Sequence, residues 1–225
     1  MNENMAGKTT SPRADVAILA CGALAREILD MARRHGWHVD MYALPAILHN
    51  RPRKIAPAVE EKLTTLATRY RKVIVAYGDC GTAGMLDSVL EKFPNARRIS
   101  GPHCYEMYGG EIYERQAEEK PGTFFLTDFL AQGFHGLVWK DLGLTRFPQL
   151  KDTYFGHYTD VMWLSQNPTP RLEQKAREAA DLLSLPLTVV HTGYGPLEER
   201  LRELIEEWEP TTEQAPQEAS SPRAS

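Results

Sequence analysis

Short apolar runs alternate with amphipathic segments along most of the chain. Residues 16–20 (VAILA) and 72–77 (KVIVAY) are almost continuously apolar, which is typical of strands buried on both faces. A glycine-containing loop follows each run, and apolar residues then recur at helical spacing, as at Leu24, Ile28 and Met31. The order strand, loop, helix predicts an α/β fold with an open, mostly parallel, Rossmann-like sheet and helices on both faces.

The same pattern places the remaining elements. Further strands are expected at 39–44, 97–100, 160–165 and 187–191. Helices are expected at 24–36, 55–70, from about 82 through 93, at 105–118, over most of 124–143, at 171–183, and after Pro196.

Both ends of the chain lack large apolar residues. Residues 1–13 and 210–225 are rich in Ser, Thr, Pro, Glu, Gln and Ala, so they bury too little surface to offset the entropy of ordering. We therefore expect disordered tails at 1–13 and 210–225 around a single α/β domain at 14–209. We expect both tails to be dispensable for folding.

Composition and charge narrow the class of protein. A chain of 225 residues with 42% hydrophobic residues can bury a real core. The net charge of −4 argues against a partner bound through basic surface, such as nucleic acid. No apolar run approaches the roughly 18–20 residues of a membrane helix, and the polar N-terminus lacks the apolar core of a secretion signal. We therefore expect a cytoplasmic protein without a nucleic-acid or membrane partner.

All three cysteines lie at or just after predicted strands. Cys21, Cys80 and Cys104 each lie in a loop that contains glycine or histidine. Ligands of parallel sheets bind beyond the carboxyl ends of the strands, so we expect the three thiols to converge at one edge. Converging thiolates bind zinc or a [4Fe–4S] cluster, and three protein ligands leave the open position of a catalytic metal. The spacings of 59 and 24 residues match no zinc-finger or ferredoxin pattern, and each cysteine could instead be a small buried hydrophobe.

Three further side chains are candidates for acid/base chemistry. His103 adjoins Cys104, Asp79 precedes Cys80, and His191 ends a predicted strand, so its ring is expected to reach the same edge as the cysteines. Each could alternatively ligate or orient a metal, as could His49, or simply hydrogen-bond a neighbouring loop.

Glycines at the helix entries are candidates for contact with a cofactor. They permit tight turns and close backbone approach, and helix N-termini there suit an anion. The expected cofactor-binding glycines are Gly22, Gly78, Gly81, Gly193 and Gly195. Neither a dinucleotide fingerprint nor a Walker loop occurs, so NAD or ATP binding is unsupported. Turn geometry alone is the other explanation of these glycines.

A cysteine-nucleophile enzyme is an alternative interpretation. Cys104 beside His103, or Cys80 beside Asp79, would lie at a helix N-terminus, where the dipole lowers a thiol pKa. This interpretation needs one cysteine and leaves the other two unexplained.

Several loops together resemble one family. The resemblance is carried by residues 20–24 (ACGAL), 48–52 (LHNRP), 77–81 (YGDCG), 101–105 (GPHCY), 121–129 (PGTFFLTDF) and 191–195 (HTGYG). Over about residues 16–201 the chain resembles the family of domain of unknown function 1638. The resemblance implies an association with corrinoid-dependent methyltransferases of one-carbon metabolism. In architecture alone, the three cysteines resemble the open [4Fe–4S] sites of quinolinate synthase, the diphthamide-forming enzymes and the reductase that ends the non-mevalonate isoprenoid route.

Two functions therefore follow from the sequence. The first is a metalloenzyme, or a metal-dependent accessory protein in methyl transfer, that acts on a small-molecule substrate. The second is a non-catalytic module that carries a small ligand or docks a methyltransferase or corrinoid protein. The sequence leaves open whether the chain is an enzyme, which metal it takes, and whether it forms oligomers.

Overall fold

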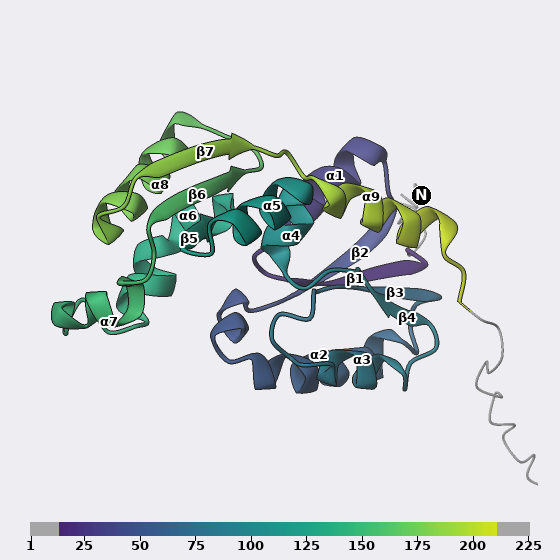
Figure 1. The fold of residues 1–225 in the computed structure, drawn as a ribbon. Helices are drawn as coiled ribbons and strands as arrows, with labels where there is room; N and C mark the ends of the chain where they lie inside the picture. The colour runs from purple at the N-terminus through teal and green to yellow at the C-terminus, as the bar shows by residue number, and fades with distance from the viewer. Residues whose placement is uncertain (1–13, 211–225) are drawn as a thin grey trace, which may run out of the picture.

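The computed structural model describes residues 14–210, which contain seven β-strands arranged in two parallel sheets (Figure 1). The tail expected at 1–13 lies outside the described residues, and so does the tail expected at 210–225 apart from its first residue. Within residues 14–210, no helix is both long enough and apolar enough to cross a lipid bilayer.

The first sheet is built from the N-terminal half of the chain. Its strands are β1 (Val16–Cys21), β2 (Val39–Leu44), β3 (Lys72–Ala76) and β4 (Ala96–Arg98). They run parallel in the order β2-β1-β3-β4. Helices α2 (Ile55–Leu66) and α3 (Met85–Leu90) cover one face, and α1 (Ala25–His35) and α9 (Pro196–Arg202) cover the other (Figure 1).

Alternation along the buried strands explains these two layers. Ile18 of β1 packs with Ile28 of α1 and Leu197 of α9, while its neighbour Leu19 packs with Val59 of α2. Successive side chains of a strand point to opposite faces, so a strand covered on both sides needs an uninterrupted apolar run. This requirement accounts for the apolar sequences of β1 and β3.

The second sheet follows two short connecting helices. After β4 the chain forms α4 (Cys104–Gly109) and α5 (Glu111–Glu119), then β5 (Thr123–Leu126), β6 (Asp160–Ser165) and β7 (Leu187–His191). These strands are parallel in the order β5-β6-β7. Helices α6 (Asp128–Phe134) and α8 (Pro170–Leu183) share an apolar core with β5 and β6. From β7 the chain returns to the first sheet through α9 (Figure 1).

The remaining elements are short. They are the 3₁₀ helices η1 (Ala46–Asn50), η2 (Pro52–Lys54) and η4 (Pro148–Leu150), the helix α7 (Lys151–Phe155), and the π-helical segments η3 (His135–Lys140) and η5 (Glu203–Glu207).

The expected α/β class with parallel strands and flanking helices is confirmed, with the strands divided between two sheets. Three strand predictions, at 39–44, 160–165 and 187–191, match the structure to the residue. The helix expected over most of 124–143 is wrong at its start, because residues 123–126 form β5. The helix expected at 105–118 is divided at Gly110, whose φ of +49° is in the left-handed region that favours glycine.

Candidate functional site

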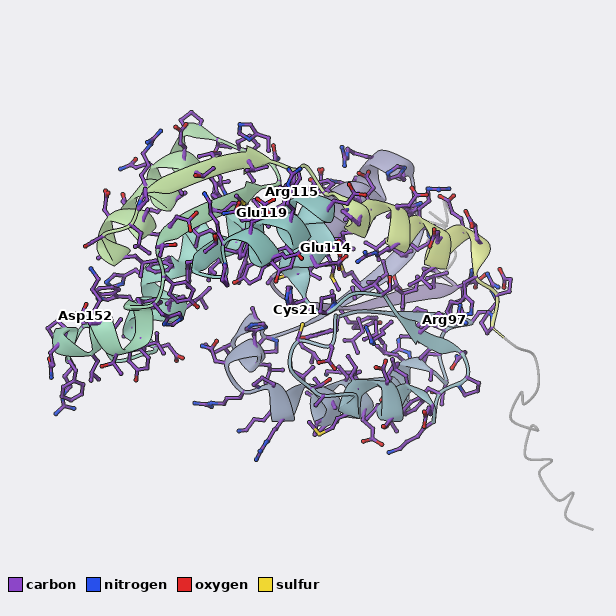
Figure 2. All side chains as sticks on the ribbon, viewed as in Figure 1. Cys21, Arg97, Glu114, Arg115, Glu119 and Asp152 are labelled. Carbon is purple, nitrogen blue, oxygen red and sulfur yellow. The ribbon has the colours of Figure 1, made fainter. Side chains whose placement is uncertain are left out.

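The three cysteines meet at the carboxyl edge of the first sheet. Cys21 is the last residue of β1, Cys80 follows β3, and Cys104 begins α4 just after β4. Since β1, β3 and β4 are neighbours in the sheet, their carboxyl ends lie side by side. All three thiols are free and partly buried, and all three line one cavity of about 180 Å³. Figure 2 shows Cys21 near the centre of the molecule, between the two sheets.

Two loops hold Cys80 and Cys104 together. The backbone N–H of Cys80 donates to the carbonyl of Pro102 (2.7 Å), and that of Asp79 donates to the carbonyl of Gly101 (3.2 Å). A Cβ at Gly78 would lie 2.8 Å from backbone atoms of Pro102 and His103, so only glycine permits this approach. Cys80 itself has a φ of +49°, an uncommon conformation for a residue with a side chain. The loop geometry therefore fixes Cys80 against the segment that leads into Cys104.

The second half of the chain closes the cavity. Phe124 of β5 and a set of side chains from α6 and η3 line the wall opposite the cysteines; they are Phe129, Leu130, Leu137 and Val138. Residues of η1, including Ile47 and His49, line the remaining side. Asn50 connects η1 to η3, because its amide donates to Asp141 Oδ2 (2.8 Å). The thiols thus face a largely apolar space between the two sheets.

Burial keeps the thiols protonated. Loss of solvation raises the pKa of all three thiols, and that of Cys80 to about 11. For Cys80 and Cys104, the charge of the neighbouring cysteines raises the pKa further. The mutual effect shows that the three sulfurs interact electrostatically. A thiol with a raised pKa is a poor nucleophile at neutral pH, which disfavours the cysteine-nucleophile interpretation.

A tight mononuclear site is not formed in this structure. Among residues 14–210, no group of three or more His, Cys, Asp or Glu side chains is arranged to hold a metal ion. Zinc–sulfur bonds of about 2.3 Å would require sulfurs roughly 4 Å apart. The cysteines share a cavity without this close grouping.

Two buried polar groups lie on the loops that carry the thiols. The Tyr77 hydroxyl is hydrogen-bonded to the Cys21 thiol and has no nitrogen or oxygen partner within the described part of the chain. His103, which does not line the cavity, has no side-chain or backbone partner at Nδ1 from another described residue. Tyr77 lies next to Cys21, and both lie at the strand ends of the first sheet. His103 is held by Tyr113, whose hydroxyl is 3.1 Å from Nε2, and burial lowers the pKa of His103. An unsatisfied buried polar atom costs about 1–3 kcal/mol, so a bound ligand that supplies a partner would be stabilised here.

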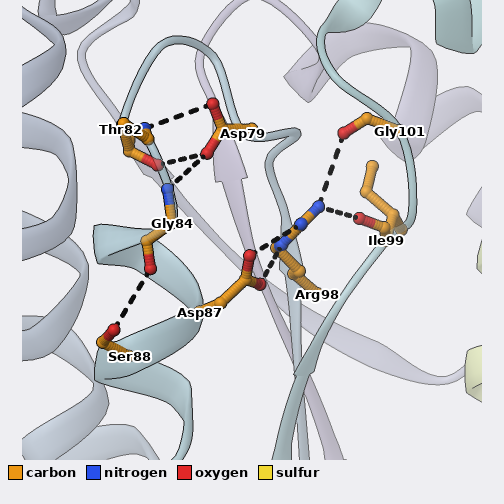
Figure 3. Close-up of polar contacts among 9 residues, drawn as sticks. Asp79, Thr82, Gly84, Asp87, Ser88, Arg98, Ile99 and Gly101 are labelled. Atoms are coloured by element: carbon orange, nitrogen blue, oxygen red, sulfur yellow. Dashed lines mark hydrogen bonds and ion pairs between the residues drawn. The ribbon is translucent and has the colours of Figure 1, made fainter.

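Asp79 orders its own loop. Its carboxylate accepts hydrogen bonds from Thr82 Oγ1 (2.8 Å) and from the backbone N–H groups of Gly84 (3.0 Å) and Ala83 (3.3 Å), as Figure 3 shows in part. These bonds hold the pKa of Asp79 below its ordinary value. Asp79 is not among the cavity-lining residues. The structure therefore gives it the turn-forming role that the sequence left as an alternative.

A second contact anchors the neighbouring loop. Arg98, at the end of β4, forms an ion pair with Asp87 of α3 and donates to the carbonyls of Ile99 (3.1 Å) and Gly101 (3.4 Å) (Figure 3). These bonds fix the backbone just before Pro102, and so contribute to the placement of Cys104.

His191 lies elsewhere. It ends β7 of the second sheet, opposite Ser165 in the register, and is exposed. We expected its ring to reach the edge that carries the cysteines, but it does not line their cavity. The physical reason is the division of the strands into two sheets, since the carboxyl ends of β1 and β7 belong to different edges.

Only one of the five candidate glycines lines the thiol cavity. Gly78 lines the cavity, whereas Gly22, Gly81, Gly193 and Gly195 do not. Gly195 has a φ of +52°, and a Cβ there would lie 2.2 Å from the carbonyl oxygen of Tyr108, so packing against α4 requires it.

The residues that sequence reasoning missed are Tyr77 and the apolar wall on β5, α6 and η3. The motif at 121–129 was the available signal for that wall, but a helical interpretation of it concealed β5.

Comparisons with known proteins give one match. No curated protein and no solved structure matches the chain. A family model described as "Protein of unknown function (DUF1638)" matches residues 43–201, which is more than half of the chain. The matched residues include Cys80 and Cys104 and begin after Cys21. The chain belongs to this family, DUF1638.

Proposed function

We propose that this chain is an iron–sulfur protein in which Cys21, Cys80 and Cys104 together hold one [4Fe–4S] cluster. The observation that carries the proposal is the convergence of all three cysteines of the sequence on a single cavity at one sheet edge.

The donor set suits a cluster better than zinc. A cluster spreads its thiolate ligands more widely than a single ion does, which suits three thiols that line one cavity from three separate loops. The thiol protons, retained because of burial and mutual repulsion, would leave on binding, since the positive charge of iron stabilises the thiolates. Zinc is the alternative ion, and it would require the three sulfurs to move closer together.

A [4Fe–4S] cluster with three thiolate ligands supplies one open iron, which binds a small polar substrate, or it transfers electrons. The chain's own residues then have distinct tasks. The apolar wall of Phe124, Phe129 and Leu137 excludes water from the thiols. His103 adjoins Cys104 without lining the cavity, and Tyr113 fixes its ring through Nε2, so it would position the Cys104 loop, whereas His49 is the histidine that lines the cavity.

The wider setting is part of the proposal. Three free thiols suit a reducing compartment, so we place the protein in the cytoplasm. The role in corrinoid-linked methyl transfer, with a methyltransferase or corrinoid protein as partner, rests on the family resemblance and stays a prediction.

The test is the metal content of protein purified without oxygen. We expect a brown protein with about four iron and four sulfide ions per chain, and loss of both in Cys21→Ala, Cys80→Ala and Cys104→Ala. His191→Ala is the control and should keep its iron, because His191 lies on the other sheet. One zinc per chain would overturn the cluster and keep a thiol-bound metal. Wild-type protein without metal would overturn both and favour the non-catalytic binding module.

A further inference from the structure

A second hollow adjoins the thiol cavity. It is a groove of about 1260 Å³ lined by residues of α1, α6 and α8. Phe129 and Leu137 line both the groove and the thiol cavity, so the segment from α6 to η3 separates the two. The groove also reaches Asn167 and Thr169, which follow the carboxyl end of β6. It therefore lies at the edge of the second sheet, as the thiol cavity lies at the edge of the first.

The groove contains a buried carboxylate that no other residue pairs with. Glu27 of α1 lines it and is only 7% exposed. Within residues 14–210, its carboxylate accepts a hydrogen bond only from the backbone of Glu27 itself; Arg26 attracts it, but no basic side chain forms a salt bridge with it. A buried charge is ordinarily paired or hydrogen-bonded more fully, because leaving water costs several kcal/mol. Glu27 can therefore accept further hydrogen bonds from a ligand.

The surroundings of Glu27 strengthen this conclusion. Asp128, also buried, lies near enough to repel it. Asp128 is itself fully engaged, because it accepts hydrogen bonds from Trp163 Nε1 (2.9 Å) and from the backbone N–H groups of Asn167 (2.7 Å) and Gln166 (3.2 Å). The Tyr108 hydroxyl, buried and without a partner among the described residues, interacts electrostatically with both carboxylates. The groove is thus lined by the carboxylates of Glu27 and Asp128, while the Tyr108 hydroxyl lies outside its lining.

The rim of the groove carries the opposite charge. Arg26 of α1 and Arg171 of α8 line it and are exposed, and within residues 14–210 neither forms a salt bridge or a side-chain hydrogen bond. The other basic side chains on these helices that line the groove are engaged, since Arg33 pairs with Asp30 (3.0 Å) and Lys175 pairs with Glu178 (2.6 Å). Two guanidinium groups without a salt bridge, in one groove with a buried carboxylate, are suited to a ligand with charges of both signs.

We propose that this groove binds a small zwitterion of the amino-acid class, with its ammonium group at Glu27 and its carboxylate at Arg26 and Arg171. The ammonium group donates further hydrogen bonds to Glu27 and offsets the repulsion from Asp128. The carboxylate accepts from a guanidinium group, whose planar fork matches its geometry. This site shares no titratable side chain with the thiol cavity, so it is independent of the iron–sulfur proposal.

Isothermal titration calorimetry with defined probes tests this site on the full chain. The probes are glycine, 4-aminobutyrate and 6-aminohexanoate, which differ in the distance between their charges. Ethylamine and acetate carry one charge each and serve as comparisons. We expect at least one zwitterion to bind the chain. We expect ethylamine and acetate each to bind at least about tenfold more weakly than that zwitterion. Failure of all three zwitterions to bind, or equal binding of ethylamine or acetate, would overturn the proposal.

Variants connect the binding to the floor and the rim. Glu27→Gln should weaken zwitterion binding about tenfold or more, because the amide carries no charge. Glu173→Gln on α8 is the matched control, since Glu173 pairs with Arg177 and does not line the groove. Thermal unfolding shows whether the Glu27→Gln variant remains folded. Arg171→Gln changes an exposed side chain, and we expect this second variant to bind the zwitterion more weakly as well. Undiminished binding by both Glu27→Gln and Arg171→Gln would contradict the site.

Discussion

At the carboxyl edge of the first sheet the strands lead into thiols, a tyrosine and a histidine, whereas at the second sheet they lead into a carboxylate, amides and hydroxyls. The first edge leaves Tyr77 with only the Cys21 thiol as a partner, among three thiols that burial keeps protonated. The second edge uses Asp128 to accept three N–H groups from β6 and the loop that follows it. The same topology therefore places protonated thiols at one edge and a carboxylate that accepts three N–H groups at the other, although Ser165 Oγ beside that carboxylate lacks a partner among the described residues.

This difference separates positions that hold the fold from positions that await a ligand. Asp79 and Asp128 both follow parallel strands, and both carboxylates accept hydrogen bonds from donors of their own chain. Glu27 is buried and the three cysteines are partly buried, and in each of them the cost of lost solvation exceeds the effect of the few hydrogen bonds and charges nearby, so each pKa is raised. Location at a strand end indicates where a site can lie, and the hydrogen-bond inventory indicates which residues belong to it.

The largest effect is expected from Asp128→Ala. The substitution leaves the Trp163 indole N–H and two backbone N–H groups without an acceptor in the core of the second sheet. We expect a loss of about 3–5 kcal/mol in the free energy of unfolding, measured by urea denaturation. Asp79→Ala is the comparison, and its more exposed loop should lose only about 1 kcal/mol. Equal losses would show that the two carboxylates do not differ as described.

Gly78→Ala comes next in size. The new Cβ would meet the backbone of Pro102 and His103 at 2.8 Å, which forces the two cysteine-bearing loops apart. We expect about 2–3 kcal/mol of destabilisation together with loss of bound iron. Gly136→Ala is the control, because nothing lies within 4 Å of a Cβ there and its φ is not positive. A stable Gly78→Ala protein with its full iron content would show that the loop contact does not position the thiols.

Glu27→Gln should stabilise the protein, and the gain should depend on pH. Burial is the main cause that raises the pKa of Glu27 above its ordinary 4.5; Asp128 and Asp30 add to the rise, and the hydrogen bond from its own backbone and the charge of Arg26 oppose it. A raised pKa contributes stability that is present below pH 4.5 and is lost as the pH rises through the folded-state value. The variant avoids this loss. We therefore expect its free energy of unfolding to exceed that of the wild type by about 1 kcal/mol at pH 8, and this difference to disappear near pH 4. Urea denaturation at both pH values measures the difference, and a gain independent of pH would contradict the assignment.

His191→Ala should have the smallest effect. Its side chain is exposed at the end of an edge strand and contacts neither the thiol cavity nor the groove. We expect a change of less than about 0.5 kcal/mol in unfolding free energy, as for other surface substitutions. A large loss of stability would contradict the exposed position of His191.

Local pattern was sufficient to predict much of the fold. The apolar runs of β1, β3 and β6 and the left-handed Gly36 after α1 are short-range signals, and the structure contains each of them. The cysteines could be placed at one edge because each follows a strand of the first sheet. The identity of β5 was missed because its four residues, two of them aromatic, also fit a buried helix.

The division into two sheets could not be predicted from local pattern. Every strand of both sheets is parallel and followed by a helix, so the sequence around β7 looks the same whether or not β7 joins the first sheet. His191 was assigned to the cysteine edge for this reason. Glu27 escaped notice because it is one charged residue in an amphipathic helix, and only the packing of α1 against the second half of the chain buries it.

The most direct test of the central claim is a crystal structure of protein purified without oxygen, with anomalous diffraction data collected at the iron absorption edge. We predict a single iron-containing density in contact with the sulfurs of Cys21, Cys80 and Cys104 and bordered by Tyr77 and His49. Three separate thiols with no iron density between them, or iron bound away from any one of the three, would contradict the account.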